Sequence, residues 1–150
     1  GAYGVIAGQV VDVQSERGKL LGKKFDTLQY IHLHKTADLF KLSIRTGAII
    51  AKASDEQLET VTRFAERLGL AFQVADDILD ETCSFEALGK TPGKDKQAGK
   101  LTYVSAFGIE NAKCKLTCLF KECYAILREH NIQSQIFEEI IEGIKKRVKL

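Results

Sequence analysis

The fold follows from a long amphipathic stretch, VTRFAERLGLAFQVADDILD, which occupies residues 61–80. Its apolar side chains recur at helical spacing over about five turns, without the alternation that is typical of strands. A helix of this length is stable in water when its apolar face packs against other helices. The apolar face is formed by Val61, Phe64, Ala65, Leu68, Phe72, Ala75, Ile78 and Leu79.

The segments on both sides of this stretch show the same helical periodicity. The chain contains a single proline, Pro92, so its helices can run long. We therefore predict an all-α fold, a bundle of about six helices or part of a larger one. We expect buried helices over 3–13 and 27–52, and further helices over 54–80, after Thr102 and over 134–148. Capping-box spacing occurs at Asp26 with Gln29 and at Ser54 with Gln57, and Gly8 should permit a close approach of backbones.

Composition excludes several classes of protein. The 150 residues are 45% apolar and 28% charged with a formal net charge of +2, which fits a globular protein and argues against disorder and against nucleic-acid binding by bulk charge. The uncharged start, residues 1–11, is too short to span a bilayer and has no basic flank. We expect no membrane span and no signal peptide, and a cytoplasmic location. Because the sequence contains no methionine, we also expect a processed product or a fragment.

The cysteines and histidines do not have the spacing of a zinc site. The four cysteines form no CxxC pair, so free thiols are expected. His32 and His34 are two residues apart, which places them on different sides of a helix and argues against shared metal ligation.

Three aspartates, Asp76, Asp77 and Asp80, lie together at the end of the long helix. Their spacing of three and four residues places them on one face, where they repel one another and oppose the negative end of the helix dipole. Carboxylates without nearby histidine or cysteine suit a hard cation, and Mg²⁺ bridging to a phosphate is our first choice. The alternative is a solvated acidic helix end that neighbouring lysines balance.

The segment after these aspartates loses helical periodicity between residues 81 and 100. It is rich in glycine and lysine, including Lys90, Lys94, Lys96 and Lys100. Lysine serves phosphate as a mobile point charge, and glycine lets backbone N–H groups approach anionic oxygens. The segment matches no P-loop pattern, and a basic surface linker is the alternative interpretation.

These motifs resemble those of the trans-polyprenyl diphosphate synthases, the family of farnesyl and geranylgeranyl diphosphate synthases. The resemblance covers essentially the whole chain and corresponds to the second, C-terminal half of the family's polyprenyl synthetase domain. It implies an isoprenoid synthase-type helix bundle and, usually, a homodimer. The motifs that carry it are Gly8-Gln9 with Asp12, Lys35-Thr36 with Leu39-Phe40, Phe72-Gln73 before Asp76-Asp77-Ile78-Leu79-Asp80, Gly89-Lys90-Thr91, Gly93-Lys94-Asp95, and Lys100-Leu101-Thr102-Tyr103.

The resemblance also implies a role for each matching residue. Mg²⁺ would be held by Asp76, with Asp77, Asp80 and Asp95 completing its shell and Asp12 reaching toward the metals. Lys35, Lys90 and Lys100 would bind the allylic diphosphate. Thr36 and Gln73 would lie beside the ionising carbon, and the terminal Lys146, Arg147 and Lys149 would close over the site. Val5, Phe40 and Phe72 could line the substrate cavity, although ordinary core packing is the simpler interpretation.

The implied reaction is the condensation of isopentenyl diphosphate with an allylic diphosphate, giving a farnesyl or geranylgeranyl product. The family's first aspartate-rich motif is not present before Asp76. We therefore expect this chain alone to be inactive and to need the complementary N-terminal half. Two alternatives remain open: a non-catalytic or truncated prenyltransferase-like subunit that acts by helix packing, and a terpene cyclase.

Overall fold

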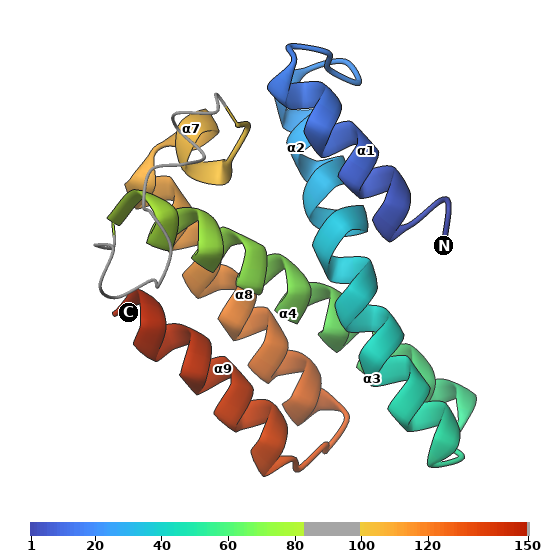
Figure 1. The fold of residues 1–150 in the computed structure, drawn as a ribbon. Coiled ribbons are helices and arrows are strands. Elements are labelled where there is room, and N and C mark those ends of the chain that lie inside the picture. The colour runs from blue at the N-terminus through green and yellow to red at the C-terminus, as the bar shows by residue number, and fades with distance from the viewer. Residues whose placement is uncertain (83–99, 150) are drawn as a thin grey trace.

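The structure, a computed structural model, describes residues 1–82 and 100–149. All regular structure in these ranges is helical, which confirms the predicted all-α fold (Figure 1). The elements are α1 (Val5–Glu16), α2 (Lys24–Ile31), the π-helix η1 (His32–Ala37), α3 (Asp38–Ile50), α4 (Asp55–Thr82), α7 (Tyr103–Phe107), α8 (Ile109–Glu129) and α9 (Gln135–Val148).

Helix α4 lies at the centre of the bundle. It contacts α8 and α9 along one side and η1 and α3 along the other, while α1 packs on η1 (Figure 1). The core lies between α4, α8 and α9, where Phe64, Leu68, Leu116 and Leu119 are almost fully buried. The periodicity of residues 61–80 thus identified the central helix, and α4 carries the three aspartates at its C-terminal end.

One of the two predicted capping boxes is present, and the other is not. Ser54 and Gln57 form the predicted reciprocal cap, since each backbone N–H donates to the other's side chain. Ser134 caps α9 by accepting from the Phe137 N–H. The capping box predicted at Asp26 is wrong, because α2 already begins at Lys24 and no side chain caps it.

The segment expected as one buried helix over 27–52 differs in two respects. Its middle is π-helical rather than α-helical, and α3 has no buried residue. Helix α1 is likewise buried on one face only, through Gly8, Val11, Asp12 and Ser15. Large apolar side chains on the outer faces of both helices are at least one-third exposed: Ile6, Val10, Val13, Leu39, Leu42, Ile49 and Ile50.

The cysteines that the structure describes are free, as expected. Cys114 and Cys118 are exposed on α8, and Cys123 is buried in the core; Cys83 lies outside the described residues. Among residues 1–82 and 100–149, no helix combines the length and the apolar character that a membrane span needs.

Candidate diphosphate and metal site

The π-helix η1 carries Lys35 and Thr36 and is held between two glycine-bearing helices. A Cβ on Gly8 of α1 would lie 2.2 Å from the Lys35 backbone nitrogen, and one on Gly69 of α4 would lie 2.6 Å from the Ala37 Cα. No side chain fits at either position, so both helices approach the backbone of η1 directly. Short π-helical segments often mark functional sites, because the additional residue per turn redirects the neighbouring side chains. This segment turns Lys35 toward α1 and Thr36 toward α4.

Lys35 and Asp12 form a close ion pair between η1 and α1. The Asp12 side chain is 3% exposed and the Lys35 side chain 28% exposed, so the lysine extends from a buried carboxylate toward the surface. Only Oδ2 of Asp12 takes part in this pair; Oδ1 is buried and has no hydrogen-bond partner among residues 1–82 and 100–149. A buried carboxylate oxygen without a partner is costly, and it is a suitable acceptor for a metal-bound water or a cation.

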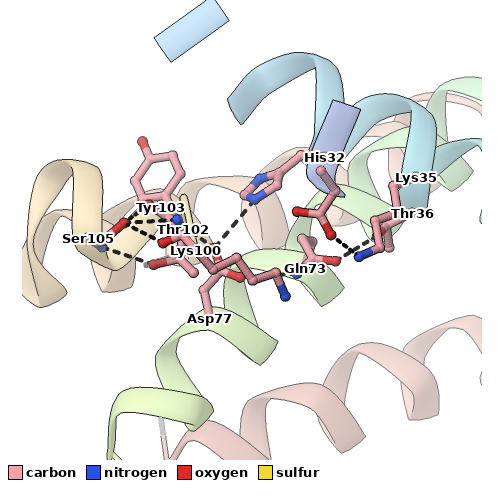
Figure 2. Close-up of polar contacts among 10 residues, drawn as sticks. His32, Lys35, Thr36, Gln73, Asp77, Lys100, Thr102, Tyr103 and Ser105 are labelled. Atoms are coloured by element: carbon pink, nitrogen blue, oxygen red, sulfur yellow. Dashed lines mark hydrogen bonds and ion pairs between the residues drawn. The ribbon is translucent and has the colours of Figure 1, made fainter. Parts of the chain in front are cut away.

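Thr36, Gln73 and Asp77 form a continuous hydrogen-bond chain between η1 and α4 (Figure 2). The Thr36 hydroxyl donates to Gln73 Oε1 at 2.6 Å, and Gln73 Nε2 donates to Asp77 Oδ1 at 3.0 Å. The resemblance predicted Thr36 and Gln73 as neighbours at the reacting carbon. The structure brings these two side chains together and joins them to the aspartate cluster.

Asp77 faces the interior, where α7 and η1 meet α4. Its Oδ2 accepts the backbone N–H of Tyr103 at 2.6 Å and lies 3.4 Å from Nε2 of His32 (Figure 2). The side chains of Asp77 and His32 are 2% and 6% exposed. The rings of His32 and Tyr103 are roughly parallel, with centroids 6.5 Å apart. Asp77 is therefore the meeting point of three segments that are distant in sequence.

The remaining aspartates, Asp76 and Asp80, lie near the C-terminal end of α4. Asp80 is buried, and Asp76 is partly buried. Asp77, Asp80 and Lys100 line a cavity of about 200 Å³ with Glu81, Thr102, Val104 and Ser105. Within residues 1–82 and 100–149, no group of three or more histidine, cysteine, aspartate or glutamate side chains is arranged to hold a metal ion. Lys90 and Asp95 lie outside the described residues.

The basic C-terminus lies near the same end of α4. Arg147 and Lys149 line a cavity of about 290 Å³ with Ile78, Leu79, Thr82, Lys113 and Val148. Lys146 is not among the residues that line it. The aromatic rings of Phe40 and Phe72, both partly buried, lie 5.3 Å apart and pack against the core.

A separate charged cluster lies at the junction of η1 and α3. Asp38 contacts His34 at 2.9 Å and Lys41 at 2.7 Å. Burial alone would raise the pKa of Asp38, but hydrogen bonds from Lys41 and His34 outweigh it and hold that pKa below its usual value. The carboxylate is thus ionised at neutral pH, and it links His34 of η1 to Lys41 of α3.

The sequence interpretation did not include His32 or Tyr103 in the site. Tyr103 contributes its backbone N–H, for which side-chain chemistry gives no signal. His32 could have been found from its position four residues before Thr36, because i,i+4 residues share a helix face. His32 was excluded as a metal ligand because of its spacing from His34, and it was assigned no other role.

Comparison with known proteins agrees with this geometry. Residues 2–144 match the polyprenyl synthetase family. The chain belongs to that family. It is 51% identical over 113 residues to the heterodimeric geranylgeranyl pyrophosphate synthase large subunit 2 of Arabidopsis thaliana, covering 75% of this chain and 30% of that protein. It is 44% identical over 122 residues to a dimethylallyltranstransferase of Fischerella ambigua, and this match covers 81% of this chain and 35% of that protein.

A solved structure shows the same fold. Geranyltransferase from Helicobacter pylori, complexed with magnesium and isoprenyl diphosphate, superposes with a TM-score of 0.77 at 29% identity, covering 97% of this chain and 48% of that one. This polyprenyl synthetase chain therefore spans about a third of the length of those curated relatives and about half of that solved structure. The relatives are prenyltransferases, which confirms the family predicted from the motifs.

Proposed function

We propose that this chain provides the C-terminal, diphosphate-binding half of a short-chain prenyl diphosphate synthase. The complete domain would condense isopentenyl diphosphate with an allylic diphosphate. The observation that carries the proposal is the pairing of Lys35 with buried Asp12 beside the chain from Thr36 through Gln73 to Asp77. Lys35 supplies positive charge for a leaving diphosphate. Thr36 and Gln73 supply neutral oxygens for a developing positive charge.

The lysines act on the leaving group. Lys35 is partly exposed, and its ammonium is oriented by the buried Asp12 carboxylate, so it can donate to a phosphate oxygen without a large loss of side-chain freedom. Lys100 lines the cavity beside Asp80, and Lys90 is proposed to act with it. Positive charge fixed at these positions stabilises the negative charge that develops on the diphosphate.

The polar and apolar residues of η1 and α4 act on the allylic fragment. The Thr36 hydroxyl donates to Gln73, which leaves the lone pairs of Thr36 Oγ1 available to face a positive carbon. The rings of Phe40 and Phe72 provide an apolar surface nearby that excludes water, and a carbocation needs such an environment to escape capture.

The donor set fits Mg²⁺ in its chemistry. Asp76 and Asp80 would provide oxygen ligands, and Asp95 is proposed as an outer carboxylate. Oδ1 of Asp12, which has no hydrogen-bond partner in the described part of the chain, could accept from a metal-bound water. Few direct protein ligands are needed, because Mg²⁺ keeps several waters and binds substrate phosphates. When bound, the ion would neutralise charge on the departing diphosphate.

Replacing Lys35 tests the proposal. We expect Lys35→Ala to weaken the binding of geranyl diphosphate in the presence of Mg²⁺ by about 1–3 kcal/mol, because a charged hydrogen bond is lost. Lys41→Ala is the control, since it removes a lysine whose partners are Asp38 and Glu66. Calorimetric titration measures both, after circular dichroism has shown equal helicity. Equal affinity in the wild type and Lys35→Ala would reject the role of Lys35.

A second candidate function is that of a non-catalytic subunit acting by helix packing. The exposed apolar faces of α1 and α3 favour it; Ile6, Leu42 and Ile50, for example, are 60%, 62% and 77% exposed. A chain with this role alone would bind partner helices and have no Mg²⁺-dependent affinity for an allylic diphosphate.

A further inference from the structure

We propose that one end of the bundle binds the surface of an anionic lipid bilayer. The contact surface consists of residues 17–25, which join α1 to the start of α2, and of Phe107 in α7. Both parts lie at the same end of the molecule in Figure 1, and the rings of Phe25 and Phe107 are in contact. These residues have no part in the diphosphate and metal site proposed above, so the inference does not rest on the proposed function.

The segment 17–25 carries four positive charges and no negative charge. The nearest acidic residues in sequence are Glu16 and Asp26, one at each end. All four basic side chains are exposed, and none of them forms an ion pair with another residue in 1–82 or 100–149. A cluster of this kind is attracted to a surface of fixed negative charge, such as a layer of acidic lipid headgroups. The basic residues are Arg17, Lys19, Lys23 and Lys24.

Large apolar side chains lie among these charges. Leu20 and Leu21, at the centre of the segment, are 40% and 53% exposed. Phe25 is 50% exposed and Phe107 is 36% exposed, and their rings meet edge to face with centroids 5.8 Å apart. Removing such side chains from water is favourable. At a bilayer interface they can enter the acyl region, while the lysine and arginine head groups stay among the phosphates.

Hydrogen bonds and glycine conformations hold the loop in place. The Leu21 N–H donates to Thr27 Oγ1 at 3.0 Å, and the Thr27 hydroxyl donates to the Lys23 carbonyl at 3.2 Å. Gly18 and Gly22 adopt φ values of 76° and 126°, which side chains other than hydrogen disfavour. Because the loop is already ordered, burying its leucines against a partner requires little further loss of conformational freedom.

The order of the residues favours a bilayer over an acidic protein segment. The two leucines at 20–21 have two basic residues before them and two after them. A bilayer has the matching order in depth, with phosphates above the acyl chains, so the leucines can insert while the cations on both sides contact phosphate. An acidic peptide can pair with the cations but gives the leucines no apolar partner. The contribution of the leucines therefore distinguishes the two kinds of partner.

Sedimentation with lipid vesicles in EDTA provides the first test. We expect the wild-type chain to bind phosphatidylcholine vesicles that contain phosphatidylglycerol about tenfold or more tightly than vesicles of phosphatidylcholine alone. Neither Mg²⁺ nor a prenyl diphosphate is present, so the proposed function can fail while this result stands. No binding, or equal binding to both kinds of vesicle, would overturn the proposal.

A pair of charge variants locates the contact. The double change Lys23→Glu with Lys24→Glu should weaken binding to the anionic vesicles by about tenfold or more. Glutamate near the start of α2 complements the helix dipole, so the fold should be retained. The control is Lys52→Glu with Lys121→Glu, which changes the net charge equally at two exposed lysines elsewhere. Equal losses in the two double variants would show attraction by overall charge and would overturn the proposal.

A pair of apolar variants tests the role of the leucines. Leu20→Ser with Leu21→Ser should weaken binding by about fivefold or more, because burial of two partly exposed leucines is lost. The control is Leu42→Ser with Ile50→Ser on the exposed face of α3. Unchanged binding in the loop variant would show that charge alone attracts the loop, as it would attract an acidic protein segment, and would overturn the bilayer proposal.

A single tryptophan reports insertion directly, because the sequence contains none. In Leu21→Trp, we expect the fluorescence emission to shift to shorter wavelength when phosphatidylglycerol vesicles are added, and brominated lipid to quench it. In Leu42→Trp, we expect neither change. A shift at position 42 without one at position 21 would place the membrane contact on α3 and overturn the proposal.

Discussion

Asp38 controls the electrostatics at the start of α3, where it contacts His34 and Lys41. Burial opposes ionisation, but the hydrogen bonds from Lys41 and His34 dominate and lower its pKa. A carboxyl group whose pKa is lower in the folded state than in the unfolded state stabilises the fold above its unfolded pKa, which is about 3.9. That contribution is lost as the pH falls through the lower, folded pKa.

We therefore predict that Asp38→Asn lowers the free energy of unfolding at pH 7 by about 1 kcal/mol or less. The difference from the wild type should shrink as the pH is lowered from 5 to 2. Urea unfolding at several pH values measures it, with Asp26→Asn, an exposed acid in the first turn of α2, as the control. A difference that stays constant over this range would contradict the assigned pKa.

Cys123 should be chemically inert in the folded chain. Burial and the neighbouring Glu122 raise its pKa to about 12, so almost no thiolate exists at pH 8. We predict that iodoacetamide labels the exposed Cys114 and Cys118 while Cys123 reacts only after unfolding in urea. Mass spectrometry of the digested protein identifies each labelled site. Labelling of Cys123 in the native chain at the rate of Cys114 would show that the core is open.

Some of the contacts within the candidate site could be predicted from sequence, and others could not. Helical spacing placed the three aspartates together at the end of α4, and the family motifs placed Thr36 beside Gln73. The contact of Asp77 with the Tyr103 N–H could not be predicted, because it depends on how α7 returns to α4. The depth at which Asp12 is buried likewise depends on packing between α1 and η1.

The glycines of α1 and α4 determine how closely helices approach η1. We predict that Gly8→Ala lowers the free energy of unfolding by about 1–3 kcal/mol, because the added Cβ meets the backbone of Lys35, which cannot rotate away. Gly47→Ala is the matched control: its Cβ meets no atom within 4 Å in helix α3, and alanine should stabilise that helix by about 0.4–1 kcal/mol. Denaturant unfolding of both variants measures the difference. Equal stability of the two variants would show that α1 does not pack closely on η1.

Helix boundaries set by local chemistry were predicted well, and those set by tertiary packing were not. The Ser54 cap and the long α4 depend on nearby residues, so the sequence was sufficient. The π-helical turn at His32–Ala37 has no such local signal, because its hydrogen-bond shift is supported by Gly8 and Gly69 from other helices. The expected burial of α1 and α3 was wrong for a related reason. Apolar periodicity shows which face of a helix can pack, but it does not specify which other helix covers that face.

At the scale of the whole molecule, a well-packed core lies on one side of α4 and the polar site lies on the other. Helices α4, α8 and α9 bury the large side chains, while α1 and η1 add Asp12, Lys35 and Thr36 on the other side of α4. This arrangement matches the family to which the chain belongs and spans about half of a solved relative. The proposed function predicts that this chain binds a diphosphate in a Mg²⁺-dependent manner.

The most direct test of this account is isothermal titration calorimetry of the purified chain with geranyl diphosphate, once with Mg²⁺ and once with EDTA. We predict saturable binding in the presence of Mg²⁺ and at least a tenfold loss of affinity in EDTA. A fully helical chain that binds the diphosphate equally well in both conditions, or in neither, would contradict the proposed half-site.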